Sequence, residues 1–262
     1  MKRVSDKRGQ VTIFIIIAIV IVMAVIGYFF ILPRAGTTES SAAFNEENPQ
    51  AFMQTCLEAP LAETIQKVSL QGGSVNPTNY VLYQDNPIAY LCYTSEDYST
   101  CVVQQPLLKQ HIESEIETNL AIDVSDCFNS LTESYQKAKY EVSLTSGETN
   151  VELLPNRIIL SMGHILTATK GSAKRFDGFN IAADNNLYEL VGISNSIVEW
   201  ESNYGDSETT LYTSTYSKFM VEKNLGQDES KIYVLTDINT GDIFQFASRS
   251  IPLPSGFGSI NI

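Results

Sequence analysis

Hydrophobic residues form one unbroken block near the start of the chain and short periodic runs after it. Residues 11–32 contain no charged side chain over 22 positions. At a rise of about 1.5 Å per residue this block makes a helix about 33 Å long, close to the ~30 Å hydrocarbon core of a bilayer. A cleaved secretory signal has a hydrophobic stretch of about 7–15 residues and a small-residue cleavage site, and this block has neither. The pattern therefore predicts a transmembrane helix over residues 11–32.

The chain after the block reads first as a linker and then as helices. Pro33 and Gly36, followed by threonines and serines, predict a flexible linker over residues 33–48. Residues 50–70 place hydrophobic side chains at three- and four-residue steps, which predicts a helix that Gln71-Gly72-Gly73 ends. Pro106 opens a second periodic run, which predicts another helix to about residue 120.

Later segments are mostly short and β-rich, and turn residues separate them. A third helix is predicted from residue 182 to about residue 201. Strands are predicted at residues 80–83, 88–93, 139–144, 151–154, 157–162, 231–237 and 242–247. The fold class is therefore α+β: a transmembrane helix, a tether, and a head over residues 49–262 with early helices and a mainly antiparallel sheet. Residues 128–138 allow a subdivision of this head.

Charge predicts the orientation of the chain. Lys2, Arg3, Lys7 and Arg8 precede the block, so residues 1–10 should stay in the cytoplasm and the head should be exported. Residues 35–262 hold 12 of the 17 Lys and Arg residues and 29 of the 30 Asp and Glu residues, a net charge of −17. Nucleic acid requires a basic surface and is excluded as a partner. The lipid bilayer is the partner that the block predicts.

All four cysteines follow the block, which suggests two disulfides in an oxidising compartment. Three pairings are possible. We favour Cys92–Cys101, because the nine-residue step reads as one hairpin, and this choice leaves Cys56–Cys127. Zinc is a poor alternative, since zinc motifs usually place cysteines two to four residues apart. Free thiols are the remaining alternative.

The residues Lys7-Arg8-Gly9-Gln10, followed at once by the hydrophobic block, resemble the class III signal peptide of archaeal type IV pilin-like proteins. The resemblance implies that a prepilin-type peptidase cuts between Gly9 and Gln10, and that the retained helix stays in the membrane or self-associates in a filament. Two features depart from the family. Phe14 stands where many pilins carry glutamate, and Pro33 should end the helix soon after the membrane. An uncleaved anchor is the alternative.

The head carries a second resemblance, to an uncharacterised exported family of small-genome archaea. Its matching elements are Cys56-Leu57-Glu58, Leu70-Gln71-Gly72-Gly73, Cys127 and the terminal run at residues 232–237. This resemblance covers most of the chain and implies no activity.

Common catalytic and nucleotide-binding signatures are missing from the sequence, and no cofactor is predicted. Ser134 and Lys137 match S-x-x-K without its companion motifs. His111 is expected to pack on the apolar side of the second helix, and His164 lies in or beside a strand. The segment Asp237-Ile-Asn-Thr-Gly-Asp242 resembles a calcium loop but lacks its closing glutamate, so we expect a hairpin turn and no metal site. The basic cluster at residues 170–175 is expected to be a solvated loop, and the alternative is a contact with an acidic partner or a neighbouring subunit.

These observations predict a single-pass, pilin-like cell-surface protein with a structural, adhesive or assembly role. The first alternative is a monomeric membrane-tethered binding module, which the predicted linker favours. The second is an exported hydrolase. It would gain support from a pocket that joins His164 to several carboxylates.

Overall fold

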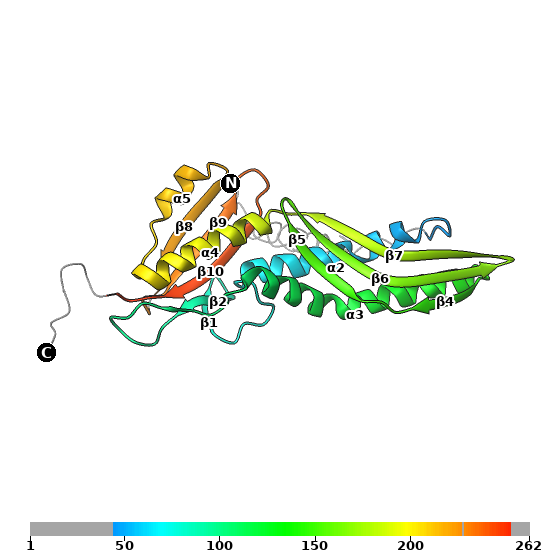
Figure 1. The fold of residues 1–262 in the computed structure, drawn as a ribbon, viewed down its shortest axis with the longest axis horizontal. Coiled ribbons are helices and arrows are strands. Elements are labelled where there is room, and N and C mark those ends of the chain that lie inside the picture. The colour runs from blue at the N-terminus through cyan, green and yellow to red at the C-terminus, as the bar shows by residue number, and fades with distance from the viewer. Residues whose placement is uncertain (1–43, 227, 253–262) are drawn as a thin grey trace, which may run out of the picture. The chain divides into compact units, whose positions relative to one another are not determined.

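The computed structural model describes residues 44–226 and 228–252, which belong to one compact unit. These residues form four helices and two mainly antiparallel sheets (Figure 1). The α+β class of the head is therefore confirmed. The helices are α2 (Pro49–Leu70), α3 (Leu108–Lys137), α4 (Leu187–Tyr204) and α5 (Thr209–Thr215).

The first sheet has the order β1-β2-β10-β9-β8, and the short strand β3 also pairs with β2. Its strands are β1 (Tyr80–Tyr83), β2 (Asn86–Tyr93), β3 (Val102–Val103), β8 (Phe219–Leu225), β9 (Lys231–Asp237) and β10 (Ile243–Arg249). The β2–β10 pair is parallel, whereas the other pairs are antiparallel. Helix α4 packs on this sheet, and α5 lies beside its edge strand β8 (Figure 1).

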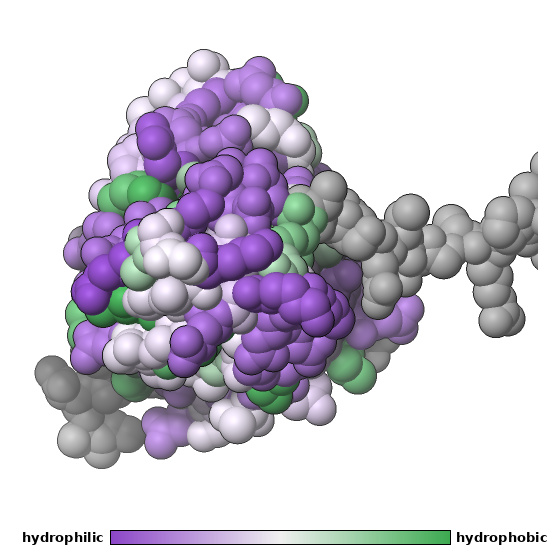
Figure 2. Space-filling view, turned by 90° about the vertical axis from the view of Figure 1, so that its right-hand side faces the viewer, coloured by the Kyte–Doolittle hydropathy of each residue, from purple (hydrophilic) through white to green (hydrophobic). Residues whose placement is uncertain are grey.

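The second sheet is built around one long strand. It consists of β4 (Glu141–Thr145), β5 (Thr149–Leu154), β6 (Arg157–Lys170) and β7 (Ser172–Asp184). Strand β7 pairs along one side of β6, while β5 and then β4 pair with successive halves of the other side. Helices α2 and α3 pack against this sheet. Figure 2 views the molecule from the right of Figure 1, where β6 turns into β7, and hydrophilic residues predominate on that face.

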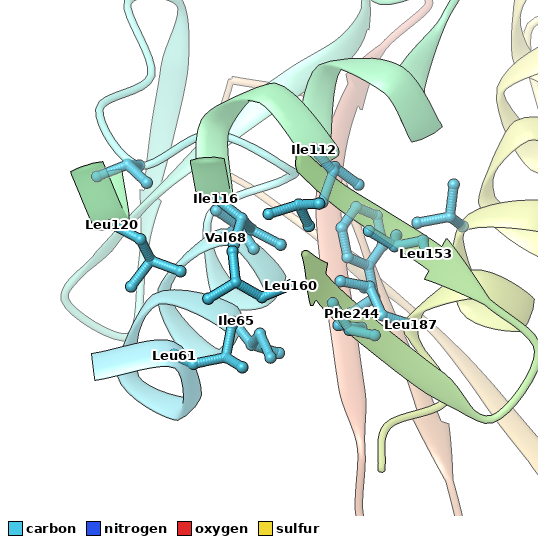
Figure 3. Close-up of a cluster of buried hydrophobic side chains, with 14 of the residues drawn as sticks. Leu61, Ile65, Val68, Ile112, Ile116, Leu120, Leu153, Leu160, Leu187 and Phe244 are labelled. Atoms are coloured by element: carbon cyan, nitrogen blue, oxygen red, sulfur yellow. The ribbon is translucent and has the colours of Figure 1, made fainter. Parts of the chain in front are cut away.

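One hydrophobic core connects the two sheets through the helices. Leu61, Ile65 and Val68 of α2 face Ile112, Ile116 and Leu120 of α3, and Leu160 of β6 lies among them (Figure 3). Phe244 of β10 lies near Leu153 and Leu187 in the same close-up, so strands of both sheets meet here. The ends of α2 and α3 thus join the two sheets into one unit.

Helix α3 is longer than the sequence analysis predicts: it ends at Lys137, not near residue 120. Val124, Cys127, Phe128, Leu131 and Tyr135 continue its buried face, and the polar residues between them hide this periodicity. The helix is continuous across residues 128–137.

The third predicted helix starts too early. Residues up to Asp184 belong to β7, and α4 begins at Leu187. Residues 170–175 are mostly exposed, as expected, but they are not a loop, because Gly171 makes a tight turn and the following residues pair with β6. The exposed side chains of β7 conceal its strand character. Strand β8 and helix α5 are absent from the sequence prediction.

Two disulfides join Cys56 to Cys127 and Cys92 to Cys101, the pairing that the sequence favours. The first connects α2 to α3. The second connects β2 to the segment before β3. Disulfides persist in oxidising environments, so this head belongs to such a compartment.

The disulfide between the helices should stabilise the head more than the other one, because it closes a loop of 71 residues rather than 9. Loop-closure entropy predicts that Cys56→Ala with Cys127→Ala lowers the free energy of unfolding by about 4 kcal/mol, against about 3 kcal/mol for Cys92→Ala with Cys101→Ala. Urea unfolding of the full chain in detergent measures both losses. The same comparison under reducing conditions gives the packing loss alone, which is subtracted. An equal or larger corrected loss for the Cys92–Cys101 pair would contradict this ranking.

Candidate binding site

Three predictions concern residues that the structure does not describe. They are the cleavage site at Gly9 and Gln10, the transmembrane helix at residues 11–32 and most of the linker. Within residues 44–226 and 228–252, no helix combines the length and hydrophobicity needed to cross a bilayer.

The turn at residues 237–242 is held by its own side chains. Asp237 Oδ1 accepts a hydrogen bond from the Asn239 N–H at 2.9 Å, and its Oδ2 accepts one from Asn186 Nδ2 at 3.0 Å. Asp242 accepts from Asn185 Nδ2 and from the Asn186 N–H, both at 2.9 Å. These carboxylates therefore join the β9–β10 turn to the start of α4. In the described part of the chain, no group of three or more His, Cys, Asp or Glu residues is placed to hold a metal ion.

Ser134, Lys137 and His111 have local partners. Ser134 Oγ donates to the Ser130 carbonyl within α3 at 2.8 Å, and Lys137 pairs with Glu133 at 3.5 Å. His111 Nε2 lies 2.7 Å from Ser74 Oγ, so this imidazole joins α3 to the loop after α2. The contacts of these three side chains therefore stabilise the local structure.

His164 lies at a β-bulge of β6. Gly163 and His164 together face the single residue Gly178 of β7, and such a bulge redirects a side chain. A side chain at Gly147 could not be accommodated, because its Cβ would lie 2.1 Å from the Gly163 carbonyl oxygen. The imidazole stacks on Phe128 of α3 with the ring centroids 4.3 Å apart.

A cleft of about 480 Å³ lies beside this imidazole, between α3 and the second sheet. Its lining includes His164, Ser125, Asn129 and a single carboxylate, Glu117. The Nδ1 atom of His164 is buried without a hydrogen-bond partner among the described residues, and burial lowers the pKa of the imidazole. All four cysteines form disulfides, so no thiol is available to this histidine. The cleft therefore does not join His164 to several carboxylates, and the hydrolase alternative gains no support from it.

A second pocket, of about 270 Å³, lies between α4 and α5. Three aromatic side chains line it: Trp200 from α4, and Tyr212 and Tyr216 from α5 and its end. Trp200 and Tyr216 are each 48% exposed, so an incoming ligand can reach their rings. The Tyr212 hydroxyl lies 3.0 Å from Ser196 Oγ, which fixes α5 against α4.

The aromatic pocket also contains polar groups. Glu208 caps the start of α5: its Oε1 accepts from the Thr210 N–H at 3.2 Å and from the Thr210 hydroxyl at 2.9 Å. These two hydrogen bonds hold the pKa of Glu208 below its usual value. Ser207 is 1% exposed, and its Oγ has no hydrogen-bond partner within residues 44–226 and 228–252. The pocket thus combines open aromatic rings with an ionised carboxylate and an unsatisfied hydroxyl.

A buried ion pair fixes the helix that carries Trp200. The Glu201 side chain has no exposed surface and accepts from Lys231 Nζ at 3.0 and 3.1 Å and from Ser248 Oγ at 2.9 Å. The Tyr233 hydroxyl also donates to Glu201, and burial followed by the charge of Glu201 raises the pKa of Tyr233. Because Glu201 must point into the protein, the preceding side chain is free to face the pocket.

Two features fix the course of the chain immediately after α4. Gly205 ends the helix with a positive φ of 80°, and a Cβ there would lie 2.3 Å from Pro252. Lys223 then bonds Asp206 at 2.9 Å and the Ser207 carbonyl at 2.9 Å. The segment that carries Ser207 and Glu208 is therefore fixed to strand β8.

His164 can be singled out in the sequence, whereas the aromatic pocket between α4 and α5 cannot. Trp200, Leu211 and Tyr216 look like scattered hydrophobic residues in the sequence, since α5 is short and has no buried residue. The aromatic residues at positions 200, 204, 212 and 216, spaced through a polar stretch around Gly205, are the sequence signal that could have indicated it.

His164 should titrate below its usual pKa of about 6.5, because burial disfavours the charged imidazole. The unfolded chain then binds this proton at a higher pH than the folded chain. The contribution of His164 to the free energy of unfolding is therefore fully present above pH ~6.5. It decreases as the pH falls from there through the lower pKa of the folded state. Chemical unfolding of wild type and His164→Phe between pH 7 and pH 4 measures this slope. The variant keeps an aromatic ring against Phe128 but has no group that titrates there, so its stability should fall less steeply with decreasing pH. Equal slopes for the wild type and the variant would contradict this prediction.

Glu201→Gln should lower the free energy of unfolding by about 3 kcal/mol, since it leaves the Lys231 charge without its buried carboxylate. Adding Lys231→Met to this variant should recover part of the loss. Glu199→Gln is the matched control, because Glu199 is exposed on the same helix and should change stability by less than about 0.5 kcal/mol. Urea unfolding followed by Trp200 fluorescence gives all three values. An equal effect at residues 199 and 201 would refute the importance of the buried pair.

No protein-family model, curated protein or solved structure shows a significant match to this chain.

Proposed function

We propose that this chain is a single-pass, pilin-like membrane protein of the cell surface with a structural, adhesive or assembly role. The observation that carries the proposal is the uncharged block at residues 11–32, which directly follows Lys7-Arg8-Gly9-Gln10. The block is long enough to cross a bilayer, and the preceding cations favour a cytoplasmic N-terminus. The head then lies outside the cell.

Two properties of the head support this location. Its two disulfides suit an oxidising compartment. Its net charge of −17 over residues 35–262, from 12 cations and 29 anions, favours solubility and disfavours contact with anionic lipid. Within this proposal, a prepilin-type peptidase processes the leader and the hydrophobic helix supports self-association.

A monomeric, membrane-tethered binding module is the second candidate function. The observation that favours it is the aromatic pocket between α4 and α5, because open rings beside fixed polar groups are typical of ligand sites. In this version the hydrophobic helix is an anchor and the head acts through its pocket. The two candidates share the anchor and differ in whether copies of the chain assemble.

The proposal predicts that the mature protein begins at Gln10. Mass spectrometry of the chain purified from its native membrane measures its N-terminus. Gly9→Val should leave the leader attached, because the resemblance places the scissile bond after Gly9. Gly36→Val is the matched control, since this glycine follows the hydrophobic block and its substitution should not affect cleavage.

A chain that still begins at Met1 or Lys2 would refute the pilin-like processing and leave an anchored binding module. Native mass spectrometry of the same detergent-solubilised sample separates the remaining cases. Higher assemblies support the structural role, whereas a monomer supports the binding module.

A further inference from the structure

The pocket between α4 and α5 has a chemistry that defines a ligand class. We infer that it binds a small organic cation with an alkylated ammonium group and a neighbouring hydrogen-bonding group. This inference rests on the binding function proposed above and names its ligand. It is independent of cleavage at Gly9–Gln10.

The aromatic lining is the first reason. Trp200, Tyr212 and Tyr216 come from two helical segments and all line one small pocket. The faces of such rings carry negative electrostatic potential, and a cation within about 6 Å of a ring centroid is attracted to it. Trp200 also packs against Tyr204, with the centroids 4.7 Å apart, and this contact limits the freedom of the indole. A ring held in place binds a ligand with less loss of conformational freedom.

The charge of the pocket is the second reason. Among the described residues that line the pocket, Glu208 is the only one with a charged side chain. Its hydrogen bonds from Thr210 keep the carboxylate ionised and fix its position. The nearby cations Lys223 and Lys231 are engaged by Asp206, at 2.9 and 3.2 Å. A cationic ligand is therefore complementary to this site, and an anionic ligand would meet repulsion.

The buried hydroxyl is the third reason. Ser207 lines the pocket, and its Oγ has no partner among the described residues, although a buried polar atom normally has one. This oxygen is buried, so a rotation of the Ser207 side chain toward the pocket would be needed for it to bond to a hydroxyl group next to the ligand's ammonium group. The volume of about 270 Å³ lies below the ~300 Å³ at which sites for drug-sized molecules begin, so the ligand must be small.

A neutral sugar is the competing ligand, since aromatic rings and hydroxyl groups suit it as well. Glu208 is exposed and stays hydrated beside a neutral sugar, whereas an ammonium ligand gains an attraction to its charge that the sugar lacks. The acidic character of the head, with 29 anions against 12 cations over residues 35–262, also raises the local concentration of cations.

The chain provides its own reporter for a test, because Trp200 is its only tryptophan. The full chain in a polyoxyethylene detergent, which contains neither sugar nor ammonium groups, is titrated with choline while Trp200 fluorescence is recorded at constant ionic strength. The neutral isostere 3,3-dimethylbutan-1-ol has the same shape and the same hydroxyl, with carbon in place of nitrogen. Glucose is the third probe.

Choline should produce a saturable change, and the neutral isostere should bind about tenfold more weakly, since the cation–π attraction and the pairing with Glu208 are both lost. Tyr216→Ala and Glu208→Gln should each weaken choline binding by about three- to tenfold and retain the reporter. Tyr188→Ala is the matched control, because this aromatic residue lies on α4 outside the pocket lining. Its choline affinity should equal that of the wild type.

Equal affinity for choline and its neutral isostere would overturn the inference, as would the absence of a saturable response to choline. Saturable binding of glucose with no response to choline would overturn the cation and leave the binding module intact. If a monomeric sample responds to none of the three probes, the pocket is not a binding site for them. The proposed membrane anchor would be unaffected by this result. Far-ultraviolet circular dichroism confirms that each variant is folded before its affinity is compared.

Discussion

The carboxylate of Glu201 has no exposed surface, and it meets the Lys231 ammonium group where α4 packs on the first sheet. Removing a charge from water costs several kcal/mol, and only a close partner with further hydrogen bonds offsets that cost. Lys231, Tyr233 and Ser248 supply these bonds from two neighbouring strands. The helix can therefore neither rotate nor slide along β9 and β10 without leaving a charge buried and unpaired.

The surface of α4 follows from this constraint. With Glu201 fixed inside, Trp200 remains on the outer face, where Tyr204 packs beside it. The chain then turns at Gly205 and Lys223 holds the next segment, so that α5 comes to lie over β8. A polar contact in the interior thus determines the position of an aromatic pocket on the exterior. Because Gly205 and Lys223 position α5, this helix does not need a large buried surface, and it contains no buried residue.

Local patterns in the sequence predict those elements whose hydrophobic residues recur at helical steps or form a continuous buried run. Helix α2 and the strands β9 and β10 are examples, and the nine-residue spacing of Cys92 and Cys101 indicates their disulfide. Strand β7 is missed because its partner β6 supplies the pairing while most of its own side chains are exposed. The aromatic pocket is missed for a related reason. Glu201 reads in the sequence as an ordinary solvated carboxylate, and only the three-dimensional fold reveals that it is buried and that it positions Trp200.

The parallel pair of β2 and β10 has a consequence for the order of folding. Strand β10 lies between β2 and β9, although more than 140 residues separate Tyr93 from Ile243 in the chain. Chains emerge from the ribosome N-terminal end first, so β2 is present long before the strand that covers its edge. An unpaired strand edge is a template for wrong pairing with another chain. The Cys92–Cys101 disulfide joins β2 to a neighbouring segment, so it can form before β10 is synthesised. The nascent chain would then contain a covalently closed hairpin whose free edge later pairs with β10.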